Sequence, residues 1–212
     1  MRRLFILIIS AIVFSSCATS KLLTSGLTYN DLTTISILNP IVEIGSIEKG
    51  NRAQYDKVIS DSSKSIIIQN IKNIFTGKQI DVIALDSLSE RELFYNISSA
   101  LKYIDKTNDI QNVRFNANID SILSSRKIDY AMIIIATGFT RMGKNYRNQM
   151  IVGAFTGMTP IKASCHMRIV IIDRKNNSIA FHRKAFPEGT EPLDSKMINK
   201  ELTMLFKDYI KK

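Results

Sequence analysis

The stretch "IDYAMIIIATGF", residues 128–139, is an almost continuous run of apolar side chains. A strand with one face in solvent alternates apolar with polar residues, whereas a strand covered on both faces is apolar along its whole length. This stretch therefore predicts a strand in the interior of a sheet, with other elements packed on both of its faces.

A β-hairpin is predicted on the C-terminal side of this strand. The sequences "IKASCHMRIVIID" (161–173) and "SIAFHRKAF" (178–186) have the composition of strands, and the turn "RKNN" separates them. Folding about this turn pairs positions whose numbers sum to about 350–351. Cys165 lies in an alternating apolar row of the first strand, so we expect a small core residue there.

Helices and further strands are predicted on both sides of these elements. The helices are expected at 52–75, 87–104, 119–123 and from Asp194 to the C-terminus, and the strands at 34–44 and 79–85. Pro40 marks an edge or a bend, because proline cannot donate to a sheet ladder. The predicted fold class is α/β, with α+β as the open alternative: a mixed sheet with helices packed against it, ending in a hairpin and a helix.

Two helices carry more detailed signals. Ser87 and Glu90 have the spacing of a capping box, and Phe94 falls near the apolar stripe that follows. In the helix at 52–75, Tyr55 falls on the apolar face, and Gly77 is a plausible stop. We therefore expect Phe94 and Tyr55 to face the core.

The N-terminal residues have the order of a bacterial secretory signal. Arg2 and Arg3 precede an apolar run from Leu4 to Phe14, and small residues follow. The run is shorter than the roughly 20 apolar residues that span a bilayer. The predicted organisation is a signal peptide at 1–16, a lipidated cysteine with a flexible tether at 17–33, and a single α/β domain at 34–212.

The lipidation is implied by a resemblance. Ser15, Ser16 and Cys17 are similar to the end of a lipoprotein signal, although that pattern has leucine where this sequence has Phe14. The resemblance implies cleavage before Cys17 and attachment of lipid, including palmitate, to its thiol. An ordinary signal with an incidental cysteine is the alternative. Ala18, in place of the aspartate that favours the inner membrane, indicates the periplasmic face of the outer membrane.

Cysteine usage agrees with this arrangement. A lipidated Cys17 leaves Cys165 as the single other cysteine, so no internal disulfide can form. The net charge of +10 would suggest nucleic acid as a partner in the cytoplasm, but export removes that partner. We expect contact with a membrane through the lipid, and a protein partner in the envelope or a homo-oligomer, without nucleic acid.

The order of elements also resembles a group of envelope lipoproteins. The strand 128–139, the connection to "TP" (159–160) and the hairpin are similar to lipoproteins related to the curli-export pore protein and to the amino-terminal domain of TolB. This resemblance implies an α/β domain that assembles with partners and has no catalytic activity.

The segment "GFTRMGKN" (138–145) is close to a phosphate-binding loop. Gly138, Gly143 and Lys144 fit that motif, but Asn145 replaces the hydroxyl that binds magnesium. The glycines and proline that follow predict a poor start for a long helix. We therefore expect no nucleotide site.

No other catalytic or metal-binding set is indicated. The predicted pairing offsets His166 from His182, so both are expected to be ordinary surface histidines. Aspartates at predicted strand ends have routine roles in turns as well as in active sites; they are Asp81, Asp86, Asp129 and Asp173. No cofactor and no metal are expected, and a periplasmic hydrolase is the alternative from the enzyme classes.

The connection at 138–160 is the most informative segment for function. It is unusually apolar for a surface connection, and it has three open interpretations: a strand pair that completes the core, an adaptable contact surface, or a membrane-spanning hairpin of a secretion-pore subunit of the curli-export type. Our candidate interaction residues are Phe139, Arg141, Met142, Lys144, Arg147, Met150 and Phe155. The expected function is that of a lipid-anchored, non-catalytic assembly or interaction component of the bacterial envelope.

Overall fold

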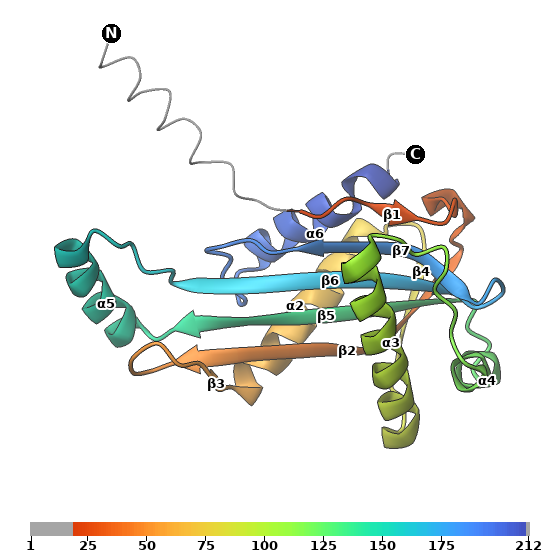
Figure 1. The fold of residues 1–212 in the computed structure, drawn as a ribbon, viewed down its shortest axis with the longest axis horizontal. Coiled ribbons are helices and arrows are strands. Elements are labelled where there is room, and N and C mark those ends of the chain that lie inside the picture. Colours follow the sequence, from red (N-terminus) through yellow and green to blue (C-terminus); the bar gives the residue numbers. More distant parts are fainter. Residues whose placement is uncertain (1–18, 211–212) are drawn as a thin grey trace, which may run out of the picture.

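The computed structural model of the protein describes residues 19–210, which fold around one mixed sheet of seven strands (Figure 1). The strand order from edge to edge is β1, β7, β6, β5, β2 and β3, and β4 also pairs with β2. The strands are β1 (Leu23–Thr24), β2 (Thr34–Ile47), β3 (Gln54–Tyr55), β4 (Gln79–Ile83), β5 (Tyr130–Arg141), β6 (Ala163–Asp173) and β7 (Ser178–Ala185). Because β2 is parallel to β4 and β5 while the other pairs are antiparallel, the predicted mixed α/β sheet is confirmed.

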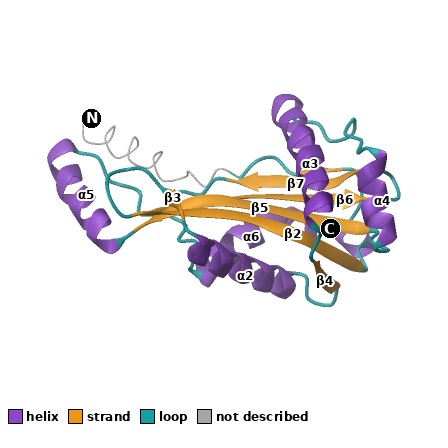
Figure 2. Cartoon of the chain, turned by 90° about the horizontal axis from the view of Figure 1, so that it is seen from below, coloured by secondary structure: helices purple, strands orange, loops and turns teal. Residues whose placement is uncertain are grey.

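Helices cover both faces of this sheet (Figure 2). One face carries α2 (Lys57–Ile74) and α6 (Ser195–Ile210), and the other carries α3 (Ser87–Thr107) and α4 (Ala117–Ser125). A further helix, α5 (Gly143–Thr156), lies beyond one end of the sheet. A short 3-10 helix, η1 (Tyr29–Asp31), precedes β2.

The central strand is buried on both faces, as its sequence predicts. Met132 and Ile134 of β5 point into the core under α2 and α6, whereas Ala131 and Ile133 point into the core under α3 and α4. Successive side chains of a strand point to opposite faces, so one apolar run serves two cores.

The core under α2 and α6 contains a cluster of aromatic rings. Phe206 lies 4.8 Å from Phe75 and 5.3 Å from Phe181 between ring centroids, and all three side chains are fully buried. Tyr209 stacks at a tilt on Phe181 at 4.9 Å. Burial of a phenylalanine contributes about 1.5–3 kcal/mol, so this cluster is a main source of the stability of this face.

The predicted hairpin is present, but its register differs from the prediction. In the structure Val170 of β6 pairs with His182 of β7. A bulge between Ile171 and Ile172 shifts the register by one residue near the turn. His182 lies opposite Val170, on the face of the sheet that α3 and α4 cover, and its side chain is only 2% exposed, so the prediction of a surface histidine is wrong. His166 is half-buried beside Phe186.

Pro40 lies at an irregularity inside one long strand. The pairing of β2 with β5 shifts register between Leu38 and Ile41, which is how a strand accommodates a residue without a backbone N–H. The bend predicted at Pro40 therefore lies within a single strand.

Helix starts differ from the predictions by one or a few residues. Asp86, not Ser87, caps α3 by accepting a hydrogen bond from the backbone N–H of Ser89 at 2.9 Å.

The N-cap of α2 is Asp56, so Tyr55 belongs to β3 and is exposed. Phe94 is also half-exposed, which corrects the prediction that these two rings face the core. Asp194 precedes α6, as predicted.

The described part of the predicted tether packs onto the sheet instead of extending from it. Thr19 bridges to Ala185, and β1 forms an edge strand on β7. The Ser20 N–H donates to the Lys184 carbonyl oxygen at 2.8 Å, and Leu32 is fully buried. This packing could not be predicted from the sequence, because backbone pairing at an edge leaves little trace in side-chain periodicity. Residues 1–18, including Cys17, lie outside the described residues.

The connection at 138–160 also differs from its prediction, since most of it is helical. Glycine is required at Gly153, where an added Cβ would lie 2.1 Å from the Met158 carbonyl oxygen. The chain can therefore fold back over the helix, which ends at Gly157 with φ of +73°. Neither a core strand pair nor a spanning strand hairpin forms in this segment.

Candidate interaction surface

The helix α5 extends away from the sheet and is attached through β5 on one side and the loop to β6 on the other (Figures 1 and 2). The root of the helix is held by hydrogen bonds. The Arg141 guanidinium donates to the carbonyl oxygens of Ile161 at 2.9 Å and Gly50 at 3.1 Å, and to the Asn145 side chain at 3.0 Å. The Asn145 amide donates to the same Gly50 carbonyl oxygen at 3.0 Å. This network fixes where α5 begins.

The surface of α5 divides along the helix axis. Its first half, "GKNYRNQ" (143–149), is polar and basic, and its second half, "MIVGAF" (150–155), is apolar. Phe155 is 87% exposed and Met158, just past the helix end, is 70% exposed. Met150, Ile151 and Val152 are each about half-exposed. Contiguous apolar patches of this kind on a protein surface mark sites of contact with a partner or a membrane.

The apolar half is exposed around most of the helix circumference. Met150, Ile151 and Val152 are consecutive, so their side chains point about 100° apart on the helix. Gly153 faces the chain that folds back over it, and Asn145 is the other buried residue of α5. The apolar surface therefore wraps around the helix instead of forming a single stripe.

The chain from β5 through α5 to the start of β6 carries only positive charges, although Glu48 of the loop after β2 lines a hollow together with Lys144. No aspartate or glutamate occurs between Asp129 and Asp173. Within residues 19–210, no salt bridge joins Lys144 or Arg147 to a carboxylate. The α5 region therefore combines unpaired cations with exposed apolar side chains.

The basic residues around the hairpin have a different environment. Arg174 pairs with Asp129 at 2.8 Å, and Arg183 pairs with Asp208 at 3.2 Å. The Asp105 carboxylate of α3 forms salt bridges with both Arg168, at 3.0 Å, and Lys184, at 2.7 Å. Although burial acts to raise the pKa of the Asp105 carboxyl, these two cations outweigh it and hold the pKa below its ordinary value. Much of the hairpin's charge is thus neutralised within the molecule.

The seven candidate interaction residues separate into two groups in the structure. Met142, Lys144, Arg147, Met150 and Phe155 are exposed on or beside α5. Phe139 and Arg141 are partly buried on β5, with the Arg141 guanidinium 5.7 Å from the Phe139 ring centroid. Ile151, Val152 and Met158 belong to the same exposed surface but were not among the candidates. Helical spacing from Arg147 through Ile151 to Phe155 was the signal that could have identified Ile151.

The segment that resembles a phosphate-binding loop leads from β5 into α5. A helix does begin at Gly143, contrary to the prediction of a poor helix start. However, the Asn145 side chain is buried and bonded to Gly50 and Arg141, so it is occupied in holding the root of α5.

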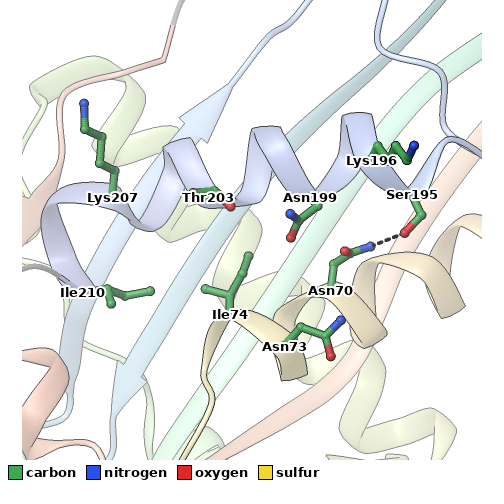
Figure 3. Close-up of a pocket in the computed structure, with 9 residues that line it drawn as sticks. All are labelled: Asn70, Asn73, Ile74, Ser195, Lys196, Asn199, Thr203, Lys207 and Ile210. Carbon is green, nitrogen blue, oxygen red and sulfur yellow. Dashed lines mark hydrogen bonds between the residues drawn. The ribbon is translucent and has the colours of Figure 1, made fainter.

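A groove lies between α2 and α6, with a mostly apolar lining and polar groups along it (Figure 3). Its volume is about 720 Å³, and its lining residues are Asn70, Asn73, Ile74, Ser195, Lys196, Asn199, Thr203, Lys207 and Ile210. The Asn70 amide donates to the Ser195 hydroxyl at 3.1 Å and thereby links the two helices. Amides, hydroxyls and two ammonium groups suit a ligand with hydroxyl or anionic groups. The groove could not be predicted from the sequence, because its two walls lie far apart in the chain.

Burial shifts the pKa values of two ionisable side chains in the core. Burial raises the pKa of the Cys165 thiol to about 12 and lowers the pKa of His182 to about 4. Within residues 19–210, no cluster of three or more metal-ligating side chains occurs, and no helix is long and apolar enough to cross a membrane.

Comparisons with known proteins do not assign this chain to a family. No protein-family model and no curated protein matches the sequence. Among solved structures, a PelC dodecamer from Paraburkholderia phytofirmans matches with a TM-score of 0.43 and 7% identity, over 89% of this chain and 95% of that chain. A leucine-to-methionine variant of the same dodecamer matches with a TM-score of 0.41 and 9% identity, over 90% and 96%. Likenesses of this size support no statement about function.

Proposed function

We propose that this protein is a lipid-anchored, non-catalytic component of the bacterial envelope that works by contact through α5. The observation that carries the proposal is the exposed apolar half of α5, beside unpaired cations and beyond the end of a well-packed sheet. Surfaces of exposed methionine, aliphatic and aromatic side chains are typical of adaptable contact sites.

The anchoring part of the proposal is supported by the sequence. A positive head, a short apolar run and small residues precede Cys17, as in a secretory signal. Acylation of Cys17 would hold the protein at the membrane, and Ala18 supports the outer membrane, facing the periplasm. Metabolic labelling with palmitate tests this step: we expect label on the wild-type protein and none on Cys17→Ser. Label that persists on Cys17→Ser would contradict it.

The non-catalytic part is supported by the environment of the reactive side chains. A thiol with a pKa near 12 is protonated at neutral pH, and His182 has no exposed ring nitrogen to offer a substrate. Glu201 is buried on α6, and burial raises the pKa of its carboxyl although it accepts a hydrogen bond from Thr190. These groups act as parts of the core.

Photo-crosslinking in living cells tests the contact surface. A crosslinking amino acid at Phe155 should give discrete adducts, with lipid, an envelope protein or a second copy of the chain. The matched control is Tyr95, an aromatic residue of α3 that is 71% exposed. Adducts from Tyr95 but not from Phe155 would overturn the assignment of the contact surface to α5.

A further inference from the structure

We propose that the apolar half of α5 is a second membrane contact, which inserts into the anionic leaflet that holds the lipid on Cys17. This inference rests on the proposed lipid anchor and names the partner of α5. Four observations support it: the direction of the N-terminal chain, its short length beyond the fold, the charge of α5, and the distribution of its apolar side chains.

The N-terminal chain leads toward the end of the sheet that carries α5. Because β1 is antiparallel to β7, following the chain from Thr24 back to Thr19 runs toward the C-terminal end of β7. Two antiparallel pairings separate β7 from β5, so β7 and β5 run in the same direction. β5 continues into α5, and the chain at Thr19 therefore heads for the same end.

The α5 helix also leans toward the edge of the sheet where Thr19 lies. In Figure 1, α5 runs from the level of β5 toward the level of β7, so its apolar C-terminal end lies on the β1 side. Thr19 pairs with Ala185, whose partner on β6 is Met167. β6 begins only four residues earlier, at Ala163, which is about 13 Å along the strand.

The packing of residues 19–33 shortens the link between lipid and fold. Only Ala18 separates Cys17 from Thr19 in the sequence, and two peptide units span at most about 7 Å. The Arg183 guanidinium donates to the Ser20 carbonyl oxygen at 3.2 Å, and the Ser20 hydroxyl accepts from the Lys184 N–H at 3.0 Å. A lipid on Cys17 would therefore bring this edge of the sheet close to the bilayer.

The chemistry of α5 fits a bilayer with anionic headgroups. Lys144 and Arg147 are exposed and form no salt bridge within residues 19–210, so both are free to contact lipid phosphates, and Glu48 is the one carboxylate that lines a hollow with Lys144. The apolar half of α5, residues 150–155, is about 8 Å long on a helix, which is within the 5–10 Å that interfacial helices reach into a bilayer.

The distribution of apolar side chains favours lipid over a protein groove. A protein groove covers one stripe of a helix, at positions i, i+3, i+4 and i+7. Met150, Ile151 and Val152 are exposed in three directions, and lipid chains can surround such a helix end on all sides. A single acyl chain gives reversible binding and stable attachment needs further contacts, which α5 would add.

The chain has no tryptophan, so one introduced tryptophan reports a single position. The experiment uses the lipidated protein, purified in detergent and reconstituted into vesicles of phosphatidylethanolamine and phosphatidylglycerol that contain brominated acyl chains. For Phe155→Trp we expect blue-shifted emission that the brominated chains quench. The matched control, Tyr95→Trp, should emit as in water and remain unquenched.

A second pair of substitutions tests the charges. Lys144→Ala with Arg147→Ala, in the Phe155→Trp background, should shift the equilibrium between inserted and free α5 about 30-fold toward the free form, at about tenfold per 1.4 kcal/mol and about 1 kcal/mol per cation. Both residues are exposed, so the fold should be retained. Vesicles of neutral phosphatidylcholine should give a similar loss of quenching.

The outcomes separate this inference from the proposed function. If the vesicles float with the protein but quench Phe155→Trp no more than Tyr95→Trp, membrane insertion is overturned and the lipid anchor stays intact. If the emission of Phe155→Trp shifts to the blue without lipid as protein concentration rises, insertion is overturned in favour of a second copy. Protein that lacks acyl groups on Cys17 would contradict the anchor, and quenching of Phe155→Trp by the same vesicles would still support insertion of α5.

Discussion

The helices α6 and α5 have similar lengths, yet one is built into the core and the other stands outside it. α6 buries Ile198, Leu202 and Phe206 on a single face, at spacings of four residues. α5 concentrates its apolar residues in the consecutive run "MIVGAF" (150–155), where only Gly153 is buried. The comparison shows that the periodicity of apolar residues, and not their number, indicates whether a helix packs on its own sheet.

The largest expected difference between the two helices is in stability. Phe206→Ala should lower the free energy of unfolding by about 3–5 kcal/mol, because it empties the space between Phe75 and Phe181. Urea denaturation measures this change. A loss below about 1 kcal/mol, far under the range for a core phenylalanine, would mean that α6 is not part of the core.

A second prediction uses pH to distinguish the stability of the sheet and its covering helices from that of α5. Burial lowers the pKa of His182 to about 4, against about 6.5 in an unfolded chain. Because the unfolded chain takes up the proton first, this contribution to stability is complete above about pH 6.5 and is lost as the pH falls toward 4. We expect a loss of about 2 kcal/mol between pH 7 and pH 5.

His182→Leu is the control for this pH dependence and should remove most of it. No aspartate, glutamate or histidine occurs from Tyr130 to Lys162, so hydrogen exchange in α5 should not follow the same pH profile. A wild-type stability that is constant from pH 7 to pH 5 would contradict the buried position of His182.

A third prediction concerns the glycines of α5. Gly153→Ala places a Cβ 2.1 Å from the Met158 carbonyl oxygen and should force the returning chain away from the helix. The expected cost is about 1 kcal/mol, at the lower end for overpacking because this chain is exposed. The effect should appear as faster hydrogen exchange in α5.

The matched control for Gly153 is Gly143→Ala, since a Cβ at Gly143 would meet no atom within 4 Å. We expect exchange as slow as in the wild type, or slower. Equal acceleration by both substitutions would show that the close approach at Met158 is not what requires glycine.

The smallest expected effect on stability is that of Phe155→Ala. A side chain that is 87% exposed makes little difference to folding, so the free energy of unfolding should change by less than about 0.5 kcal/mol. The same substitution should reduce contact with membranes. A destabilisation comparable to that of Phe206→Ala would place Phe155 in the core and contradict the comparison.

Much of the fold follows from local patterns in the sequence. The unbroken apolar run of β5 predicts burial on both faces, and the turn after Asp173 predicts the hairpin. The stripe of α6 predicts which of its side chains are buried. In each case a local pattern, an apolar run, a turn or an apolar stripe, is enough to predict how the element packs.

The features that the sequence did not predict depend on contacts between distant segments. The burial of His182 depends on α3 and α4, which cover its face of the sheet and which the local pattern of the hairpin does not reveal. The attachment of residues 19–33 uses backbone hydrogen bonds to β7. The helical form of α5 contains Gly153, which sequence statistics count against a helix but which the returning chain requires.

Hydrogen exchange of the lipidated protein, in detergent and on membranes isolated from the cells that make it, tests most directly whether α5 is a contact surface. We expect protection of residues 150–156 to rise on the membranes while that of α6 stays unchanged. The same exchange in α5 under both conditions, or protection in detergent already equal to that of α6, would contradict the account.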